Sequence, residues 1–139
     1  MIRVVLDTNV WLSGLLWGGI PRQIIALCES GRIEIVGSDE ILEEFRLILT
    51  RPKFQKRLNQ LSVTADVVLE MVREMSTFVM PEPVTVANLR DPKDSIVIAA
   101  AIAGQCSVIV SGDEDLLVLR TVFGIEIVTP REFIDRMSG

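Results

Sequence analysis

Four acidic residues in separate parts of the sequence are candidates for one metal site. They are Asp7, Glu44, Asp94 and Asp113. Carboxylate oxygens are the ligands that Mg²⁺ and Mn²⁺ prefer, and the chain has 0 histidines to build a typical zinc or copper site. Carboxylates that converge in a partly dry cleft repel one another, so they require protonation or, more simply, a bound divalent cation. Such a cation activates water and neutralises the leaving oxygen when a phosphodiester bond is hydrolysed.

The acidic candidates, and Asp91 close to Asp94 in the sequence, also have structural explanations when each is taken alone. Asp91 and Asp113 are suitable helix N-caps, and Asp94 is a favourable anion in a first helical turn. Glu44 can be read as a solvated helix charge. Asp7 is harder to dismiss, because it directly follows an apolar run near the start of the chain. The set of four is therefore better evidence for a site than any one member.

The elements that would position these residues alternate along the chain. Short β-branched runs predict strands at Ile2–Leu6, 33–36, 77–80, Val108–Val110 and Ile125–Val128. The helical pattern predicts helices at 21–30, between Ser38 and Arg51-Pro52, at 58–75 with a restart at Ser62, at 95–103, at 115–122 and from Pro130. Strands that are apolar on both faces and alternate with helices indicate a parallel sheet wrapped by helices. We expect one domain over residues 1–139.

The predicted sheet brings the acidic residues to one edge. Ligands of such sheets bind beyond the carboxyl ends of the strands, which is where Asp7 and Asp113 fall. Asp94 lies in the first turn of the helix at 95–103 or just before it. At 100° per residue, Glu44 flanks the apolar stripe of its helix, whereas Glu43 points nearly opposite to it. Glu44 can therefore face the same edge.

Basic residues near these positions are candidates for contact with phosphate groups. The segment RPKFQKR follows the Glu44 helix and places four cations around Phe54, and two more cations flank the Asp94 segment. The six are Arg51, Lys53, Lys56, Arg57, Arg90 and Lys93. A solvated helix junction is an equally good explanation of RPKFQKR. If the cations do contact phosphates, the affinity for a nucleic acid should fall steeply with salt concentration.

The composition limits the class of protein. The chain of 139 residues is 49% hydrophobic, which is ample for a core, and its 2 cysteines both lie in apolar runs, as expected in a reducing compartment. The longest apolar stretch, residues 96–110, is too short and too interrupted to span a bilayer. We expect a soluble cytoplasmic protein. The net charge of −5 argues mildly against a dedicated nucleic-acid surface, but the four acidic candidates account for most of it.

The ordered motifs of the sequence resemble those of the PIN-domain family. The motifs are LDTNVWLSGLLW, SDEILEEFRLILTRPKF, LRDPKDSIVIAAAIAG and VIVSGDEDLL, and the resemblance runs from about residue 2 to residue 128. The chain is most similar to the VapC-like toxins of bacterial and archaeal toxin–antitoxin systems. The resemblance implies a three-layer α/β/α fold around a mainly parallel sheet of about five strands. It also implies a homodimeric, metal-dependent ribonuclease with an antitoxin partner.

The same resemblance assigns roles to individual residues. The acidic positions of the family correspond to Asp7, Glu44, Asp94 and Asp113, with Asp91 and Asp115 as auxiliaries, and Asn9 and Ser111 match its polar supporting positions. Ser111 replaces a frequent threonine but keeps the hydroxyl. We expect Mg²⁺ or Mn²⁺ to be held by the four acidic residues, with Glu44 either a ligand or an orienter of the attacking water. Asn9 and Ser111 would hold the carboxylates in place.

Other functions remain open from the sequence. LDTNV superficially resembles the motif of phosphatases of the haloacid dehalogenase type, and Mg²⁺-binding receiver domains also gather acidic residues at a sheet edge. Both classes normally use a lysine after a late strand, where this chain has Ser111-Gly112-Asp113. A PIN-like module that binds RNA without cleaving it is a further alternative.

Three large apolar residues have open roles. Trp11 and Trp17 lie beyond the Asp7 strand, where packing in the core or a dimer interface is favoured over stacking on RNA bases. Leu47 points away from the apolar stripe of its own helix. An interface is the preferred explanation for Leu47, and a singly exposed leucine is the alternative.

Overall fold

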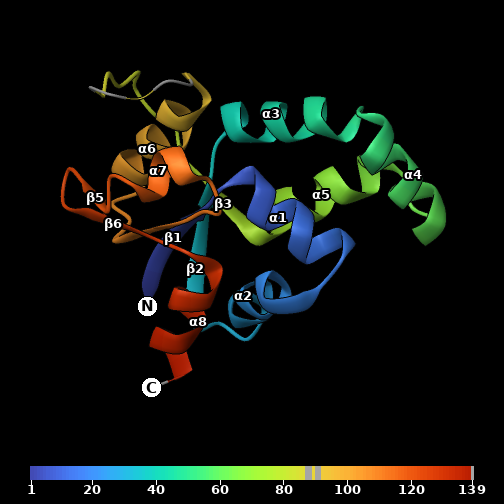
Figure 1. The fold of residues 1–139 in the computed structure, drawn as a ribbon, viewed down its shortest axis with the longest axis horizontal. Helices are drawn as coiled ribbons and strands as arrows, with labels where there is room; N and C mark the ends of the chain where they lie inside the picture. Colours follow the sequence, from blue (N-terminus) through green and yellow to red (C-terminus); the bar gives the residue numbers. More distant parts are fainter. Residues whose placement is uncertain (87–88, 90–91, 139) are drawn as a thin grey trace.

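A twisted sheet forms the centre of the protein (Figure 1). The computed structural model describes residues 1–86, 89 and 92–138. In these residues the sheet has the strands β1 (Ile2–Leu6), β2 (Ile33–Gly37), β3 (Ser76–Phe78), β4 (Val108–Val110), β5 (Thr121–Val122) and β6 (Ile125–Val128). Their order across the sheet is β3-β2-β1-β4-β6-β5, and every neighbouring pair is parallel except β5 with β6.

Helices connect the strands and cover both faces of the sheet. They are α1 (Thr8–Leu16), α2 (Gly19–Glu29), α3 (Asp39–Leu49), α4 (Pro52–Leu61), α5 (Ala65–Met75), α6 (Pro92–Ala103), α7 (Glu114–Leu117) and α8 (Pro130–Ser138). Figure 1 shows α6 and α7 on one side of the sheet and α1, α2 and α5 on the other. Within the described residues, no helix combines the length and apolar character needed to cross a membrane.

The apolar residues of each strand divide between two cores. Val4 and Leu6 of β1 point into the larger core with α1, α2, α3 and α5, whereas Val5 between them points into the smaller core with α6 and α7. This alternation follows from the period of two residues along a strand. A strand that is buried on both faces must be apolar throughout, as predicted. The α/β fold expected from the sequence is confirmed.

The path of the chain creates a crevice beside β1. From β1 the chain crosses to β2 and then to β3 on one side, and it later returns through α6 to β4 on the other side. The strand order therefore reverses between β1 and β4. In open α/β sheets, this reversal point at the carboxyl ends of the strands is where ligands bind.

The helices that start at this edge have well-defined N-caps. The backbone N–H of Thr8 donates to the Asp7 carboxylate (2.8 Å) at the start of α1. The backbone N–H of Ile41 donates to the Ser38 hydroxyl (3.2 Å) at the start of α3, as the sequence predicts. Each cap satisfies a backbone donor that the helix itself leaves without a partner.

Several element boundaries differ from those predicted. The helices predicted from the sequence include none at Thr8–Leu16, where α1 lies, although Thr8 and Asn9 are suitable residues for a helix start. The sequence pattern also assigns the restart of the helix at 58–75 to Ser62. Ser62 is instead the left-handed C-cap of α4 (φ 56°), and Thr64 caps the separate helix α5. The segment RPKFQKR is largely helical, because Pro52 occupies the first turn of α4, where a missing N–H costs nothing.

The predicted helix at 115–122 is wrong beyond Leu117, where α7 ends. Thr121–Val122 forms the antiparallel edge strand β5, so the sheet of the described residues has one strand more than the five expected. Arg120, Phe123 and Gly124 have positive φ angles of 59°, 51° and 78°. Such backbone angles are incompatible with a continuous right-handed helix.

Candidate functional site

A cavity of about 170 Å³ lies at the carboxyl ends of β1 and β4. All four acidic residues selected from the sequence line it, together with two of the predicted cations. We call it the acidic cavity, and these residues are Asp7, Glu44, Asp94, Asp113, Arg51 and Lys93. Residues that directly follow β1 and β4 thus meet residues of α3 and α6 at the strand-order reversal.

Asp7 is held rigidly at the end of β1. Its side chain is buried, with 7% of the residue exposed. One carboxylate oxygen accepts the Thr8 backbone N–H (2.8 Å), and the other accepts the Ser111 hydroxyl (2.7 Å) and, at 3.5 Å, the Asn9 side-chain amide. Hydrogen bonds of this kind compensate a buried carboxylate for its lost water.

Ser111 and Asn9 join the ends of β1 and β4. Ser111 is fully buried, and its hydroxyl donates to Asp7 while accepting the backbone N–H of Asp113 (2.9 Å). The Asn9 carbonyl oxygen accepts the backbone N–H of Gly112 at 3.4 Å. Both side chains therefore fix the position of Asp7 relative to the loop that carries Asp113.

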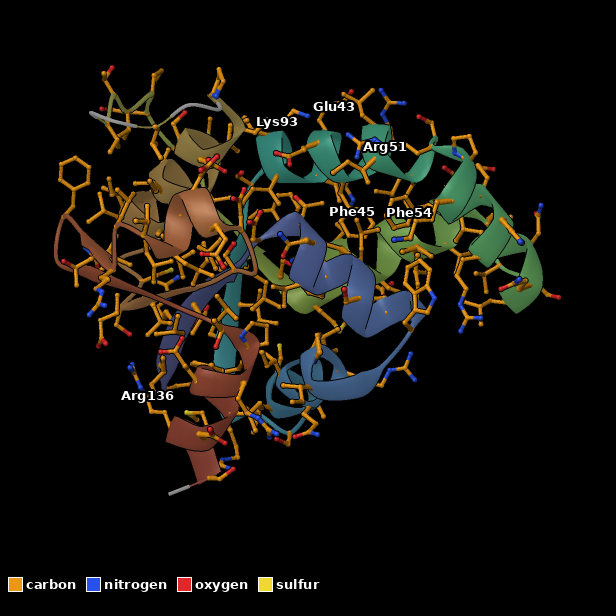
Figure 2. The ribbon with its side chains drawn as sticks, viewed as in Figure 1. Glu43, Phe45, Arg51, Phe54, Lys93 and Arg136 are labelled. Carbon is orange, nitrogen blue, oxygen red and sulfur yellow. The ribbon has the colours of Figure 1, made fainter. Side chains whose placement is uncertain are left out.

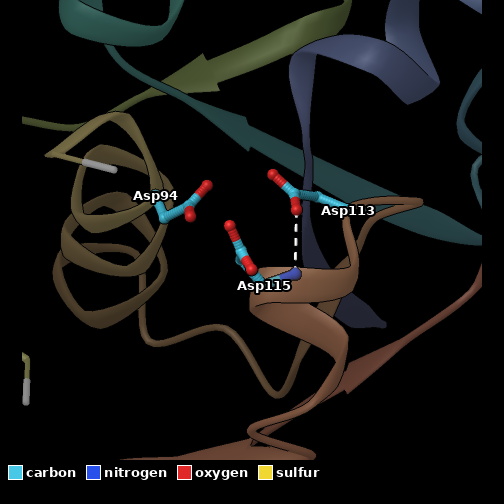
Figure 3. A group of neighbouring side chains, drawn as sticks. All are labelled: Asp94, Asp113 and Asp115. Carbon is cyan, nitrogen blue, oxygen red and sulfur yellow. Dashed lines mark hydrogen bonds between the residues drawn. The ribbon is translucent and has the colours of Figure 1, made fainter. Parts of the chain in front are cut away.

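Three carboxylates come especially close together in the described residues. One oxygen from each of Asp94, Asp113 and Asp115 lies within 4.8 Å of the other two (Figure 3). Asp113 is also the N-cap of α7, because its carboxylate accepts the backbone N–H of Asp115 (2.9 Å). This cap draws Asp115 toward Asp94, and Asp94 itself is buried in the first turn of α6.

The donor set of this trio fits a hard divalent cation. All three ligand atoms are carboxylate oxygens, and their separation allows one ion to contact them together. Asp94 is buried and the other two are half-buried, so these like charges repel one another strongly unless a counter-charge is present, which a divalent ion supplies. Asp115, expected from the sequence only as an auxiliary residue, joins Asp94 and Asp113 in this trio, whereas Asp7 lies elsewhere in the cavity lining.

The two neighbouring glutamates of α3 face different surroundings. Glu44 is half-buried and lines the acidic cavity. Glu43 is exposed and accepts the guanidinium of Arg46 (2.9 Å from Nε), a hydrogen bond that lowers the pKa of Glu43. The helical positions of Glu43 and Glu44 predict this difference.

The predicted RNA-contacting cations do not all lie at the acidic cavity. Arg51 and Lys93 line the acidic cavity, and Figure 2 shows Arg51 at the junction of α3 and α4. Lys53 and Arg57 lie close to aromatic rings of α1 and α4, and Lys56 is exposed. Arg90 and the auxiliary Asp91 lie outside the described residues.

Sequence reasoning missed the side chain of Thr8 as part of the cavity. Its hydroxyl oxygen is buried and has no hydrogen-bond partner among the described residues, although Thr8 lines the acidic cavity. The pattern Asp7-Thr8-Asn9 indicates a helix start, but it is Asp7 that caps α1. Only the orientation of the first helical turn reveals that the Thr8 hydroxyl is not used as a cap.

The two tryptophans have different environments. Trp11 is 1% exposed and belongs to the larger core, which confirms the packing role favoured for it. Trp17 is 46% exposed, so it is not a core residue. The helix α1 ends at Leu16, and the Trp17 side chain therefore lies at the helix end, outside the buried face.

The chain belongs to the PIN domain family. The sequence model of this family matches residues 3–115, which include the whole acidic cavity. The chain is also 32% identical to the uncharacterized protein MJ1680 of Methanocaldococcus jannaschii, over 99% of this chain and 92% of the relative.

Two solved structures share the fold. The crystal structure of PAE2754 from Pyrobaculum aerophilum superposes with a TM-score of 0.66 and 14% identity, over 99% of this chain and 90% of that chain. VapBC2 from Rickettsia felis, bound to a DNA fragment from its promoter, superposes with a TM-score of 0.61 and 11% identity, over 92% of this chain and 98% of that chain. At these identities the similarity establishes the fold.

Proposed function

We propose that this protein is a metal-dependent endoribonuclease that hydrolyses RNA phosphodiester bonds and acts as the toxin of a toxin–antitoxin pair. The observation that carries the proposal is the group of Asp94, Asp113 and Asp115 oxygens within 4.8 Å of one another, beside Asp7 and Glu44. Membership of the PIN domain family supports nuclease chemistry over the phosphatase and receiver alternatives.

The residues of the acidic cavity suit Mg²⁺ or Mn²⁺. Asp94 and Asp113 would hold the ion with Asp7, Glu44 and Asp115 as further direct or water-bridged ligands. When bound, a divalent ion activates a water molecule and neutralises the charge that develops on the phosphate and the leaving oxygen. Ser111 and Asn9 keep the Asp7 carboxylate and the Asp113 loop at fixed positions, which is how supporting residues tune such sites.

The cations at the cavity provide the attraction for RNA. Arg51 and Lys93 line the same cavity as the carboxylates, so they can bind the phosphate oxygens that flank the cleaved bond. Glu44, which reaches the cavity from α3, would orient the attacking water. Lys53, Lys56 and Arg57 extend this positive charge along α4.

The proposed partners follow from the same family relationship. The fold similarity to VapBC2 of Rickettsia felis supports an antitoxin protein that covers the acidic cavity. Leu47 is 54% exposed and lines a hollow with Ile48 and Ile96, so an apolar surface of α3 and α6 is present for the proposed homodimer.

Cleavage assays with defined metal ions test the nuclease directly. Unstructured and structured RNAs are incubated with the protein in Mg²⁺, Mn²⁺ or EDTA. We expect cleavage with either ion and none in EDTA. Asp113→Asn should lower the rate by about 100-fold or more, because a metal ion contributes several kcal/mol and about 1.4 kcal/mol corresponds to tenfold.

A matched control separates the site from the rest of the surface. Asp135 is exposed on α8, so Asp135→Asn should cleave at the normal rate. Cleavage that persists in EDTA or in Asp113→Asn would contradict the proposal. Binding of metal and RNA without cleavage would instead identify a non-cleaving RNA-binding module, and a phosphorylated Asp7 would identify a phosphoryl-transfer protein.

A further inference from the structure

A second cavity, of about 420 Å³, lies beside the acidic cavity between α1 and α4. We call it the aromatic cavity, and its lining is Asn9, Leu12, Ser13, Trp17, Lys53 and Phe54. Asn9, Leu12 and Phe54 line both cavities, so the two hollows are immediate neighbours. Figure 2 shows Phe54 on the side of α4 that is turned toward α1.

The aromatic cavity presents an exposed π-surface. The rings of Trp17 and Phe54 meet edge to face, with centroids 5.8 Å apart and an interplanar angle of 75°. This contact orients the Trp17 ring, yet 46% of Trp17 remains exposed. A partly exposed indole that is held in one orientation is the usual platform for stacking an unpaired nucleobase.

Positive charge surrounds the same rings. The ammonium of Lys53 lies 5.5 Å from the Trp17 centroid and 5.6 Å from that of Phe54, and the Arg57 guanidinium lies 5.6 Å from Trp17. Arg57 is anchored, because its Nε donates to the backbone oxygen of Leu16 (2.8 Å). Lys53 has a flexible four-carbon stem, so its charge can leave the ring for a phosphate when a base arrives.

These features match the chemistry of one nucleotide. A nucleotide combines a planar base with an adjacent anionic phosphate, and the aromatic cavity combines an exposed ring with adjacent cations. The side chains of Asn9 and Ser13 add polar groups that can hydrogen-bond to the edge of a base. A protein segment would not require cations placed directly against the rings.

We propose that the aromatic cavity binds an unpaired nucleobase of the RNA strand, stacked on Trp17, while the neighbouring phosphates run into the acidic cavity. The inference rests on the proposed ribonuclease function and adds to it a subsite for one nucleotide. A base inside a duplex cannot stack on a side chain, so this subsite takes a nucleotide that is unpaired.

Tryptophan fluorescence tests this site without cleavage. The chain has 2 tryptophans, Trp11 is 1% exposed and only Trp17 is accessible, so quenching by a stacked base reports on Trp17. A short single-stranded RNA is titrated in EDTA, in parallel with an abasic oligonucleotide of equal length and with duplex RNA. We expect the single strand to quench the emission and to bind more tightly than either control.

Substitutions identify the residue responsible. Trp17→Leu should weaken binding of the single strand by about tenfold, the usual loss for one base–aromatic stack. Trp17→Phe should retain most of the affinity but lose the quenching. Phe123→Leu, at an aromatic residue that is 64% exposed near β5, should change neither signal.

Two results would overturn the inference. One is equal affinity of the abasic and normal oligonucleotides. The other is unchanged RNA binding by Trp17→Leu, which would leave the cavity as a docking place for a protein segment. Binding is measured in EDTA, so the result does not depend on cleavage. If a base binds through Trp17 but the protein cleaves no RNA, only the nuclease proposal is refuted.

Discussion

Ser111 shows how a single hydroxyl can organise a site. It donates to the Asp7 carboxylate and accepts the Asp113 backbone N–H, so it links the residues that follow two different strands. It is fully buried, and removing its hydroxyl takes one hydrogen bond from each of these two partners. At the residue scale, the geometry of the acidic cavity therefore depends on a side chain that need not touch the metal ion.

Substitution of Ser111 tests this dependence. Ser111→Ala should lower RNA cleavage by about 10- to 100-fold, the range for groups that support metal ligands. Ser111→Thr keeps the hydroxyl and is the matched control, so it should retain most of the activity. Metal affinity is measured by titration of both variants, and an Ala variant with normal affinity and rate would contradict the role.

At the scale of elements, the N-cap of α3 positions Glu44. Ser38 is fully buried at the end of β2, and its hydroxyl fixes the first turn of the helix that carries Glu44 to the acidic cavity. Thr64 caps α5 in the same way, by accepting the Val67 backbone N–H (3.2 Å), but α5 contributes no residue to the cavity lining.

The two caps should differ in their effect on activity. Ser38→Ala and Thr64→Ala should each lower the free energy of unfolding by about 1 kcal/mol, measured by urea denaturation. Only Ser38→Ala should also reduce RNA cleavage, because α3 brings Glu44 to the acidic cavity and α5 brings no residue to it. Equal losses of activity in both variants would show that cleavage merely follows stability.

The start of α8 predicts a dependence of stability on pH. The Thr129 backbone N–H donates to the Glu132 carboxylate (3.1 Å), and this hydrogen bond lowers the pKa of Glu132 from its ordinary value of 4.5. A carboxylate with a lowered pKa stabilises the fold above its unfolded pKa and loses this contribution as the pH falls through its folded pKa.

The comparison with Glu132→Gln isolates this contribution. The variant should be less stable than the natural protein near neutral pH, and the difference in the free energy of unfolding should shrink as the pH falls below 4.5. Denaturation curves at several pH values measure it. A difference that stays constant with pH would mean that the charge of Glu132 contributes nothing.

For the whole molecule, net charge and metal binding are linked. The chain carries 19 acidic and 14 basic residues, and the acidic cavity concentrates carboxylates in one place. A divalent ion that binds only the folded state both relieves this repulsion and stabilises the fold. That the protein is one domain, cytoplasmic and dimeric remains a prediction.

Thermal unfolding with Mn²⁺ tests the linkage. At about 100 times the dissociation constant, the ion should stabilise the native state by about 2.7 kcal/mol and raise the melting temperature by several degrees. Asp113→Asn should show a much smaller shift, and Asp135→Asn a normal one. If all three proteins shifted equally, the ion would be binding elsewhere.

Local patterns were sufficient for most of the fold. The apolar run of β1, buried on both faces, and the cap at Ser38 depend on residues that are close together in the sequence, and both appear in the structure as predicted. The ordered acidic motifs also led from the sequence to the PIN domain family. The sequence by itself therefore determined the family, the parallel sheet and which acidic residues stand at the carboxyl ends of its strands.

Only the tertiary structure decided which side chains meet. Asp115 joins Asp94 and Asp113 because its backbone N–H donates to the Asp113 carboxylate that caps α7. The short β5 follows α7, where residues with positive φ angles prevent the helix from continuing. The aromatic cavity likewise exists because α1 packs against α4, which places Trp17 beside Phe54. These distances depend on the packing of elements far apart in the chain, and no local pattern encodes them.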